Sequence, residues 1–198
     1  QNPVMILADG MLGQMMEPVS LPEAKRMATY EEIRANKPWA ITGKGPRSER
    51  NVIKSLRLQP DVLEAHIHRL FEKYDRMEKE LVRYETYGEP DPEIVFVAFG
   101  TVARLVAETM DILTERGYKA GMIRPVTLWP FPFDAFARIS DKTRLVVSVE
   151  LSMGQLLTDV KAAVCGRVPV GLINRTGGVV PTPVEIADRA IKQLKALD

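Results

Sequence analysis

Cysteine is nearly absent from this sequence of 198 residues, which contains only Cys165. A single thiol excludes an internal disulfide framework. It also excludes an iron–sulfur cluster or a cysteine-rich zinc site held by this chain alone. Because Cys165 ends a run of small apolar residues, we expect it to be buried and not to act as a nucleophile.

Histidine is almost as scarce, with His66 and His68 as its two copies. Residues two positions apart lie on different faces of a helix, so these imidazoles are poorly placed to share one metal ion. The sequence also lacks a dinucleotide-binding fingerprint, a phosphate-binding loop and the glycine–serine elbow of esterases. The residues alone therefore predict no metal site and no catalytic residue.

Long hydrophobic runs are missing as well. The longest stretch without a charged residue covers ten positions, 94–103, about half of what a bilayer requires. The start of the chain lacks the basic and apolar regions of a signal peptide. We therefore expect a soluble, cytoplasmic protein with no membrane contact.

No charge of one sign dominates, because 27 Lys and Arg residues face 26 Asp and Glu residues. The formal net charge of +1 argues against a nucleic-acid-binding protein. Hydrophobic residues make up 45% of the chain and charged residues 27%. That balance is typical of a globular protein with one large domain or two small ones.

The first 60 residues combine an apolar run with a basic loop. Residues 4–8 predict a buried strand with no preceding element to pair with, so we expect the chain to be a fragment of a longer protein. Residues 34–57 carry seven bases against one acid, a local net charge of +6. The glycines and prolines within them predict a loop.

A long amphipathic helix is predicted over residues 61–84, with Asp61 as its N-cap. Apolar side chains recur along it at alternating spacings of four and three residues. Such a seam is too long to leave in water, so we expect it to pack on the sheet domains or on a partner subunit. Residues 88–92, with one glycine and two prolines, would then form a linker.

Residues 93–198 alternate predicted strands with predicted helices. The strands are at 94–99, 120–124, 145–149 and 168–173; the helices are at 102–113, 153–160 and 183–194, the last capped by Thr182. This order predicts an α/β fold with a mostly parallel sheet and helices on both faces. The predicted domains are thus 1–60, 61–92 and 93–198.

Ligands of such sheets bind at the carboxyl ends of the strands. Gly100 and Thr101 follow the first strand and could offer backbone N–H groups to an anion, although Thr101 acting as a helix cap is the commoner role. Glu150 ends another strand and could be an acid or a base, with a carboxylate at a helix N-terminus as the favoured alternative. Arg124 and the turn at 175–178 complete the candidates.

Four stretches, in order along the chain, resemble one thiamine diphosphate family. They are residues 3–18 (PVMILADGMLGQMMEP), 124–132 (RPVTLWPFP) and 150–155 (ELSMGQ), followed by a closing segment with 166–170 (GRVPV), 175–178 (RTGG) and 181–183 (PTP). On these motifs the chain resembles the thiamine-pyrimidine (alpha-type) subunit of the 2-oxoacid:ferredoxin oxidoreductases. Residues 13–18 resemble its 2-ketoisovalerate (3-methyl-2-oxobutanoate) branch.

The resemblance implies a transketolase C-terminal-like domain at 93–198, preceded by the tail of a pyrimidine-binding domain and a long linking helix. The implied reaction is oxidative decarboxylation of a branched-chain 2-oxoacid to an acyl-CoA and CO2, which reduces ferredoxin. A thiamine-diphosphate-binding beta subunit and further subunits would hold the thiamine diphosphate, its magnesium and the iron–sulfur clusters.

This chain would then bind no cofactor alone and would serve assembly, and we expect it to be inactive in isolation. A 2-oxoglutarate-specific or pyruvate-specific member of the same family is one alternative. A non-catalytic α/β binding module of another thiamine enzyme is a second.

The basic loop at 34–57 needs a counter-charge. The candidates are the acidic stretch after Glu72, the phosphates of coenzyme A and an acidic ferredoxin-like partner, with a solvated loop as the alternative. If the loop binds an anion, we expect Lys44, Arg47 and Arg50 to do so. The neighbouring glycines and proline place these side chains on an exposed turn, where guanidinium groups can fork onto phosphate.

Overall fold

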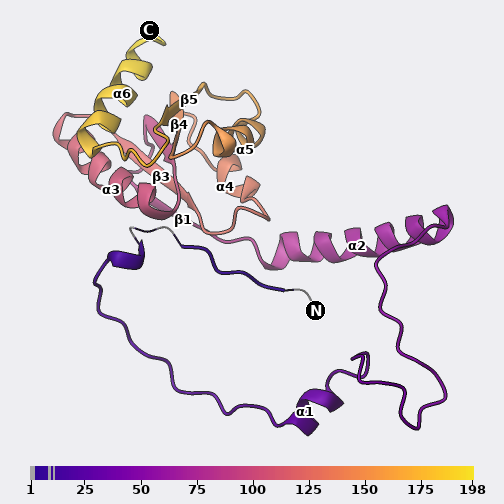
Figure 1. Ribbon diagram of the computed structural model, residues 1–198. Coiled ribbons are helices and arrows are strands. Elements are labelled where there is room, and N and C mark those ends of the chain that lie inside the picture. Colours follow the sequence, from indigo (N-terminus) through magenta and orange to yellow (C-terminus); the bar gives the residue numbers. More distant parts are fainter. Residues whose placement is uncertain (1–2, 9, 11) are drawn as a thin grey trace. The chain divides into compact units, whose positions relative to one another are not determined.

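A computed structural model describes residues 3–8, 10 and 12–198 of the chain (Figure 1). The chain divides into two units, Gln1–Arg69 and Leu70–Asp198. Within the described residues, no helix is long and apolar enough to cross a membrane.

The first unit has little regular structure. Its elements are the short 3-10 helix η1 (Leu12–Gln14), the helix α1 (Tyr30–Ala35) and the first half of α2 (Pro60–Glu80), which continues into the second unit. A reciprocal cap starts α1: the Thr29 hydroxyl accepts the Glu32 amide at 3.3 Å, and the Glu32 carboxylate accepts the Thr29 amide at 2.8 Å. None of the described residues of this unit is buried.

The buried strand predicted at residues 4–8 is wrong for the chain as described. The segment is extended, and the side chains of Val4 and Ile6 are 91% and 92% exposed. An apolar run becomes a buried strand only when neighbouring strands and a second layer cover it. The described residues of this unit supply neither.

The second unit is built on a five-stranded sheet with the order β1-β3-β2-β4-β5. The strands are β1 (Tyr84–Gly88), β2 (Ile94–Val97), β3 (Ala120–Pro125), β4 (Leu145–Glu150) and β5 (Val170–Asn174). All neighbouring pairs are parallel except β1 and β3, which pair antiparallel at one edge. The predicted α/β class with a mostly parallel sheet is confirmed.

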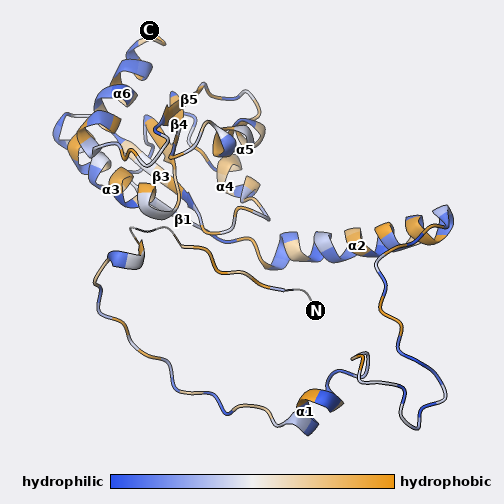
Figure 2. Ribbon diagram, in the orientation of Figure 1, coloured by the Kyte–Doolittle hydropathy of each residue, from blue (hydrophilic) through white to orange (hydrophobic). Residues whose placement is uncertain are grey.

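Helices cover both faces of this sheet (Figure 1). One face packs against α3 (Gly100–Glu115) and α6 (Pro183–Lys195), and the other against α4 (Phe133–Ala137) and α5 (Gln155–Val164). Alternate residues of β2 serve the two cores, with Phe96 facing the first and Val95 the second. The residues of the central strands are mostly hydrophobic (Figure 2), as is expected of strands that are buried on both faces.

The predicted helix over 61–84 has the wrong ends, since α2 begins at Pro60 and ends at Glu80. Tyr84 lies instead in β1, opposite Pro125. The Arg83 backbone shows why: its N–H donates to the Thr127 hydroxyl at 3.0 Å, and its carbonyl accepts the Val126 and Thr127 amides at 3.0 and 3.1 Å. A local heptad pattern cannot reveal this long-range pairing.

The predicted linker at 88–92 is a tight connection between β1 and β2. Gly88 has a φ of 106°, and a Cβ at this position would clash with the Ala120 carbonyl oxygen. Only glycine tolerates both conditions. The Glu89 amide also donates to the Ala120 carbonyl at 3.0 Å, so the connection packs directly against the start of β3.

Candidate functional site

The candidate residues after β2, β4 and β5 lie at the carboxyl edge of the sheet, and Arg124 lies near the corresponding end of β3. In parallel sheets this edge is the usual ligand site. The hydrogen bonds of each candidate show which side chains remain available.

Glu150 is 4% exposed, and both of its carboxylate oxygens accept hydrogen bonds from the chain around it. The donors to Oε1 are the Ser148 hydroxyl (3.0 Å) and the Leu157 amide (3.1 Å); those to Oε2 are the Ser152 hydroxyl and the amides of Gly154 (3.2 Å) and Leu156 (3.3 Å). The carboxylate thus accepts the free N–H groups at the start of α5, because the N-cap residue, Gly154, has no side chain that could accept them. The structure supports the helix-terminus alternative for Glu150.

Thr101 does not cap α3, so that prediction is wrong. The N-cap position belongs to Phe99, which makes no side-chain cap, and Gly100 is the first helical residue with a φ of 61°. Thr101 is therefore already inside the helix. Its hydroxyl oxygen is buried and has no hydrogen-bond partner among the described residues. Anion binding by Gly100 and Thr101 stays a prediction.

Arg124 is already paired across the sheet edge. Its Nη1 lies 2.9 Å from Glu85 Oε2 on the antiparallel strand β1. This ion pair offsets the charge that could otherwise hold a substrate carboxylate. Sequence reasoning missed it because β1 itself was not predicted.

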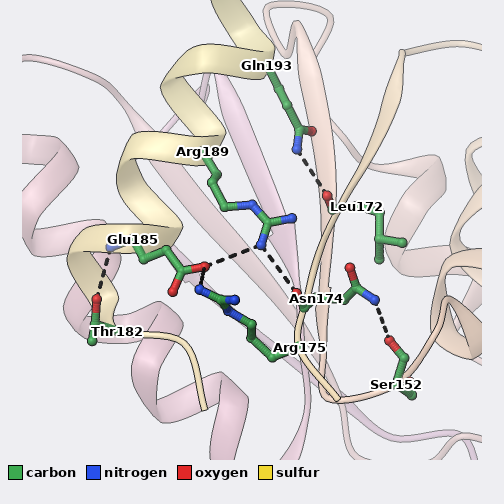
Figure 3. Close-up of polar contacts among 8 residues, drawn as sticks. All are labelled: Ser152, Leu172, Asn174, Arg175, Thr182, Glu185, Arg189 and Gln193. Atoms are coloured by element: carbon green, nitrogen blue, oxygen red, sulfur yellow. Dashed lines mark hydrogen bonds and ion pairs between the residues drawn. The ribbon is translucent and has the colours of Figure 1, made fainter. Parts of the chain in front are cut away.

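Arg175, on the turn after β5, and Arg189, on α6, both contact the carboxylate of Glu185 on α6 (Figure 3). Glu185 Oε1 lies 2.8 Å from Arg175 Nη2 and 3.4 Å from Arg189 Nη1, and Arg189 also donates to the Asn174 carbonyl at 3.2 Å. The hydrogen bond from Arg175 is the main cause that lowers the pKa of Glu185, and the same contact raises the pKa of Arg175. The cluster thus fastens the β5 turn to α6.

Two further contacts in Figure 3 hold β5 to its neighbours. The Asn174 side-chain amide donates to the Ser152 carbonyl at 2.8 Å, and the Gln193 amide donates to the Leu172 carbonyl at 3.0 Å. The first contact joins the end of β5 to the turn after β4, and the second holds α6 to the middle of β5. The polar groups at this edge therefore serve mainly to fix the turns.

The basic loop of the first unit forms a small hollow of about 300 Å³, lined by Ile41, Gly43, Lys44, Arg47, Arg50 and Asn51. The Asn51 side-chain amide closes the loop by donating to the Pro38 and Ala40 carbonyls at 2.8 and 2.9 Å. The structure thus brings the three predicted cations together around one hollow. None of the three forms an ion pair with a described residue.

The histidines and the cysteine lie on two different helices, α2 and the end of α5. His66 lies on α2, where partial desolvation, followed by the charges of Arg57 and Arg69, lowers the pKa of its imidazole. In the described part of the chain, no group of three or more potential metal ligands comes together. Cys165 is exposed, so the prediction that it is buried is wrong. It occupies the C-cap of α5 with a left-handed φ of 52°, beyond the last buried turn.

Comparisons with known proteins agree with one another. Residues 92–186 match the profile of pyruvate:ferredoxin oxidoreductase core domain II. Over 178 residues, 90% of this chain, the sequence is 40% identical to the ketoisovalerate oxidoreductase subunit VorB of Methanothermobacter marburgensis. It is 34% identical over 170 residues, 84% of this chain, to the 2-oxoglutarate synthase subunit KorA of Archaeoglobus fulgidus. The chain spans about half the length of these relatives, 49% and 47%.

The fold also has a counterpart among solved structures. A 2-oxoglutarate:ferredoxin oxidoreductase from Magnetococcus marinus, solved with 2-oxoglutarate, coenzyme A and succinyl-CoA bound, aligns with a TM-score of 0.62. The alignment covers 78% of this chain and 28% of that chain, at 20% identity. This likeness shows a shared fold.

Proposed function

The chain belongs to the 2-oxoacid:ferredoxin oxidoreductase family, and we propose that it forms the C-terminal part of the thiamine-pyrimidine subunit of such an enzyme. The observation that carries the proposal is the 40% identity to a ketoisovalerate oxidoreductase subunit over 90% of the chain. The complete enzyme would convert a branched-chain 2-oxoacid and coenzyme A into an acyl-CoA and CO2, with ferredoxin as the electron acceptor.

The contribution of this chain would be assembly, because its residues do not fit the cofactors of the reaction. Thiamine diphosphate supplies the carbanion chemistry of such enzymes. The buried carboxylate at the sheet edge, Glu150, already accepts five hydrogen bonds from the chain itself. One exposed cysteine cannot hold an iron–sulfur cluster. A thiamine-diphosphate-binding beta subunit and further subunits would therefore carry the cofactors, magnesium and the clusters.

Reconstitution tests this function and its substrate. The subunit containing this chain would be co-purified with its partner subunits, and coenzyme A-dependent reduction of ferredoxin would be followed with 2-oxoisovalerate, 2-oxoglutarate and pyruvate. We expect kcat/KM to be highest for 2-oxoisovalerate, and the isolated chain to be inactive. A higher kcat/KM for 2-oxoglutarate or pyruvate would assign the enzyme to another substrate branch of the family. Failure with all three acids in an assembled complex would overturn the activity and favour a binding module.

The basic hollow would bind an anion of this reaction, either the phosphates of coenzyme A or an acidic ferredoxin surface. Lys44, Arg47 and Arg50 surround it with no acidic partner among the described residues. The Arg47 guanidinium already donates to the Lys44 and Gly43 carbonyls, so Arg50 is the side chain that can bind a phosphate or carboxylate in a bidentate fork. The hollow is concave, which favours a phosphate group over a flat protein surface.

Charge removal within the basic segment separates these alternatives. Replacing Lys44, Arg47 and Arg50 by Ala should raise the KM for one of the two anions about tenfold, and added salt should shrink the effect. The matched control removes the same charge from Arg34, Lys54 and Arg57, which lie in the same segment but outside the hollow. If the two variants have equal KM values for coenzyme A and equal KM values for ferredoxin, the hollow binds neither anion and the loop is a solvated surface.

A further inference from the structure

An aromatic groove on the second unit has no role in the function proposed above. It lies between the C-terminal half of α2 and residues 128–134. Three adjoining hollows of about 420, 370 and 500 Å³ form it, and all three are lined by Glu78. Trp129 lines two of them, and Asp134 also lines two. The shared residues make the three hollows one continuous feature.

The groove exposes a row of aromatic side chains. Tyr74 packs edge-on against Trp129 with ring centroids 5.5 Å apart, and Phe71 packs against Tyr74 at 5.9 Å. Trp129 is nevertheless 53% exposed and Phe71 59% exposed. Neighbouring aromatic rings that fix one another and still face solvent mark an interaction surface.

Carboxylates surround these rings. Asp75, Glu78, Asp134 and Asp159 line the three hollows, against two bases, Lys79 and Arg138. None of the four acids forms an ion pair or a side-chain hydrogen bond with any residue the structure describes, whereas six carboxylates elsewhere in this unit have basic partners. The groove therefore combines excess negative charge with accessible aromatic faces.

We propose that this groove binds an extended, arginine- or lysine-bearing segment of a partner polypeptide. A cation over an aromatic ring is attracted by the ring's quadrupole, and a carboxylate beside the ring adds an ion pair. Three adjoining hollows can each accept a side chain, which a polypeptide segment supplies and a single compact cation does not. Apolar residues between the basic ones would cover the exposed rings. This proposal goes beyond the oxidoreductase activity and does not depend on it.

The two tryptophans of the chain, Trp39 and Trp129, allow a direct test. Trp39→Phe in the full chain leaves Trp129, in the groove, as the sole tryptophan. The probe is a short blocked peptide in which arginine alternates with glycine and leucine. We expect saturable changes in Trp129 emission that weaken as salt is raised. The same peptide with glutamate in place of arginine should leave the emission unchanged.

Matched charge variants in that background locate the site. Asp75→Asn, Glu78→Gln and Asp134→Asn together should raise the Kd of the arginine peptide about tenfold. The control carries Glu108→Gln, Asp111→Asn and Glu115→Gln, three exposed acids of α3, and should keep the original Kd. The proposal is overturned if the peptide fails to change Trp129 emission, if the glutamate peptide binds equally, or if both variants weaken binding alike. Each of these results leaves the enzymatic assay unaffected.

Discussion

The two units of this chain contain similar side chains and differ in what covers them. In Leu70–Asp198 each face of a five-stranded sheet is covered by helices, and side chains such as Phe96 and Phe136 are completely buried. In Gln1–Arg69 none of the described residues is buried, although apolar runs such as 4–8 are present. Hydrophobicity alone therefore does not make a core.

Pairing and layering account for the difference. The strand β2 has hydrogen-bonded neighbours on both sides and helices on both faces. The described part of the first unit offers its apolar side chains no comparable layer. Apolar burial supplies the main favourable free energy of folding, so the two units should respond very differently to the same substitution.

The largest expected effect is on the free energy of unfolding, and it is tested by one leucine substitution in each unit. Leu113→Ala in α3 removes a completely buried side chain and should lower the free energy of unfolding by about 3 kcal/mol. Leu56→Ala in the first unit, where the side chain is 67% exposed, should change it by less than about 0.5 kcal/mol. Urea unfolding followed by circular dichroism measures both. A comparable loss for Leu56→Ala would reveal a core in the first unit.

The Glu150 carboxylate is expected to matter almost as much. Glu150→Gln replaces an acceptor oxygen by an amide group that faces N–H donors of α5, and it removes the charge that these donors stabilise. We expect a loss of about 2 kcal/mol in the free energy of unfolding. Glu108→Gln, on an exposed face of α3, is the matched control and should be neutral. Equal stabilities of the two variants would show that the network around Glu150 contributes nothing.

Much of the second unit could be predicted from local patterns. The continuous apolar runs predicted β2 and β4, and the Thr182 cap of α6 was read correctly, since its hydroxyl accepts the Glu185 amide at 3.1 Å. The edge strand β1 escaped prediction because its first residue, Tyr84, continues the spacing of the α2 seam. Its pairing with β3 joins positions about 40 residues apart. The short helix α4 (Phe133–Ala137) was too brief for a periodic signal.

The site was less predictable than the fold. The sequence named Lys44, Arg47 and Arg50, and the structure places them around one hollow. It also indicated Glu150 as a candidate, but the five hydrogen bonds that its carboxylate accepts could not be predicted from the sequence. The aromatic groove was invisible, because Tyr74 and Trp129 are brought together only by the tertiary fold. Charge runs and turns can be read locally, whereas convergence of distant side chains cannot.

A smaller effect is expected at Thr101, whose hydroxyl oxygen is buried and has no hydrogen-bond partner among the described residues. Thr101→Val keeps the side-chain shape and removes the unsatisfied hydroxyl. We expect the free energy of unfolding to rise by up to about 1 kcal/mol. Thr101→Ser keeps the hydroxyl and should give no such gain. If valine destabilises the protein, the hydroxyl has a partner, and the anion-binding prediction for Gly100 and Thr101 gains support.

The smallest expected effect is the pH response of Glu185, whose pKa is lowered from its ordinary value of about 4.5, first by the hydrogen bond from Arg175. A carboxylate with a lowered folded-state pKa stabilises the fold above its unfolded-state pKa and loses that contribution as the pH falls through the folded-state value. Because the pair is partly exposed, Glu185→Gln should cost at most about 1 kcal/mol at neutral pH. The difference from the wild type should disappear at pH values well below 4.5.

The control for this prediction is Glu115→Gln. Glu115 is an exposed acid without an ion pair among the described residues, so its substitution should show no such pH-dependent difference. A Glu185→Gln difference that persists unchanged in acid would mean that packing, and not charge, holds the β5 turn against α6.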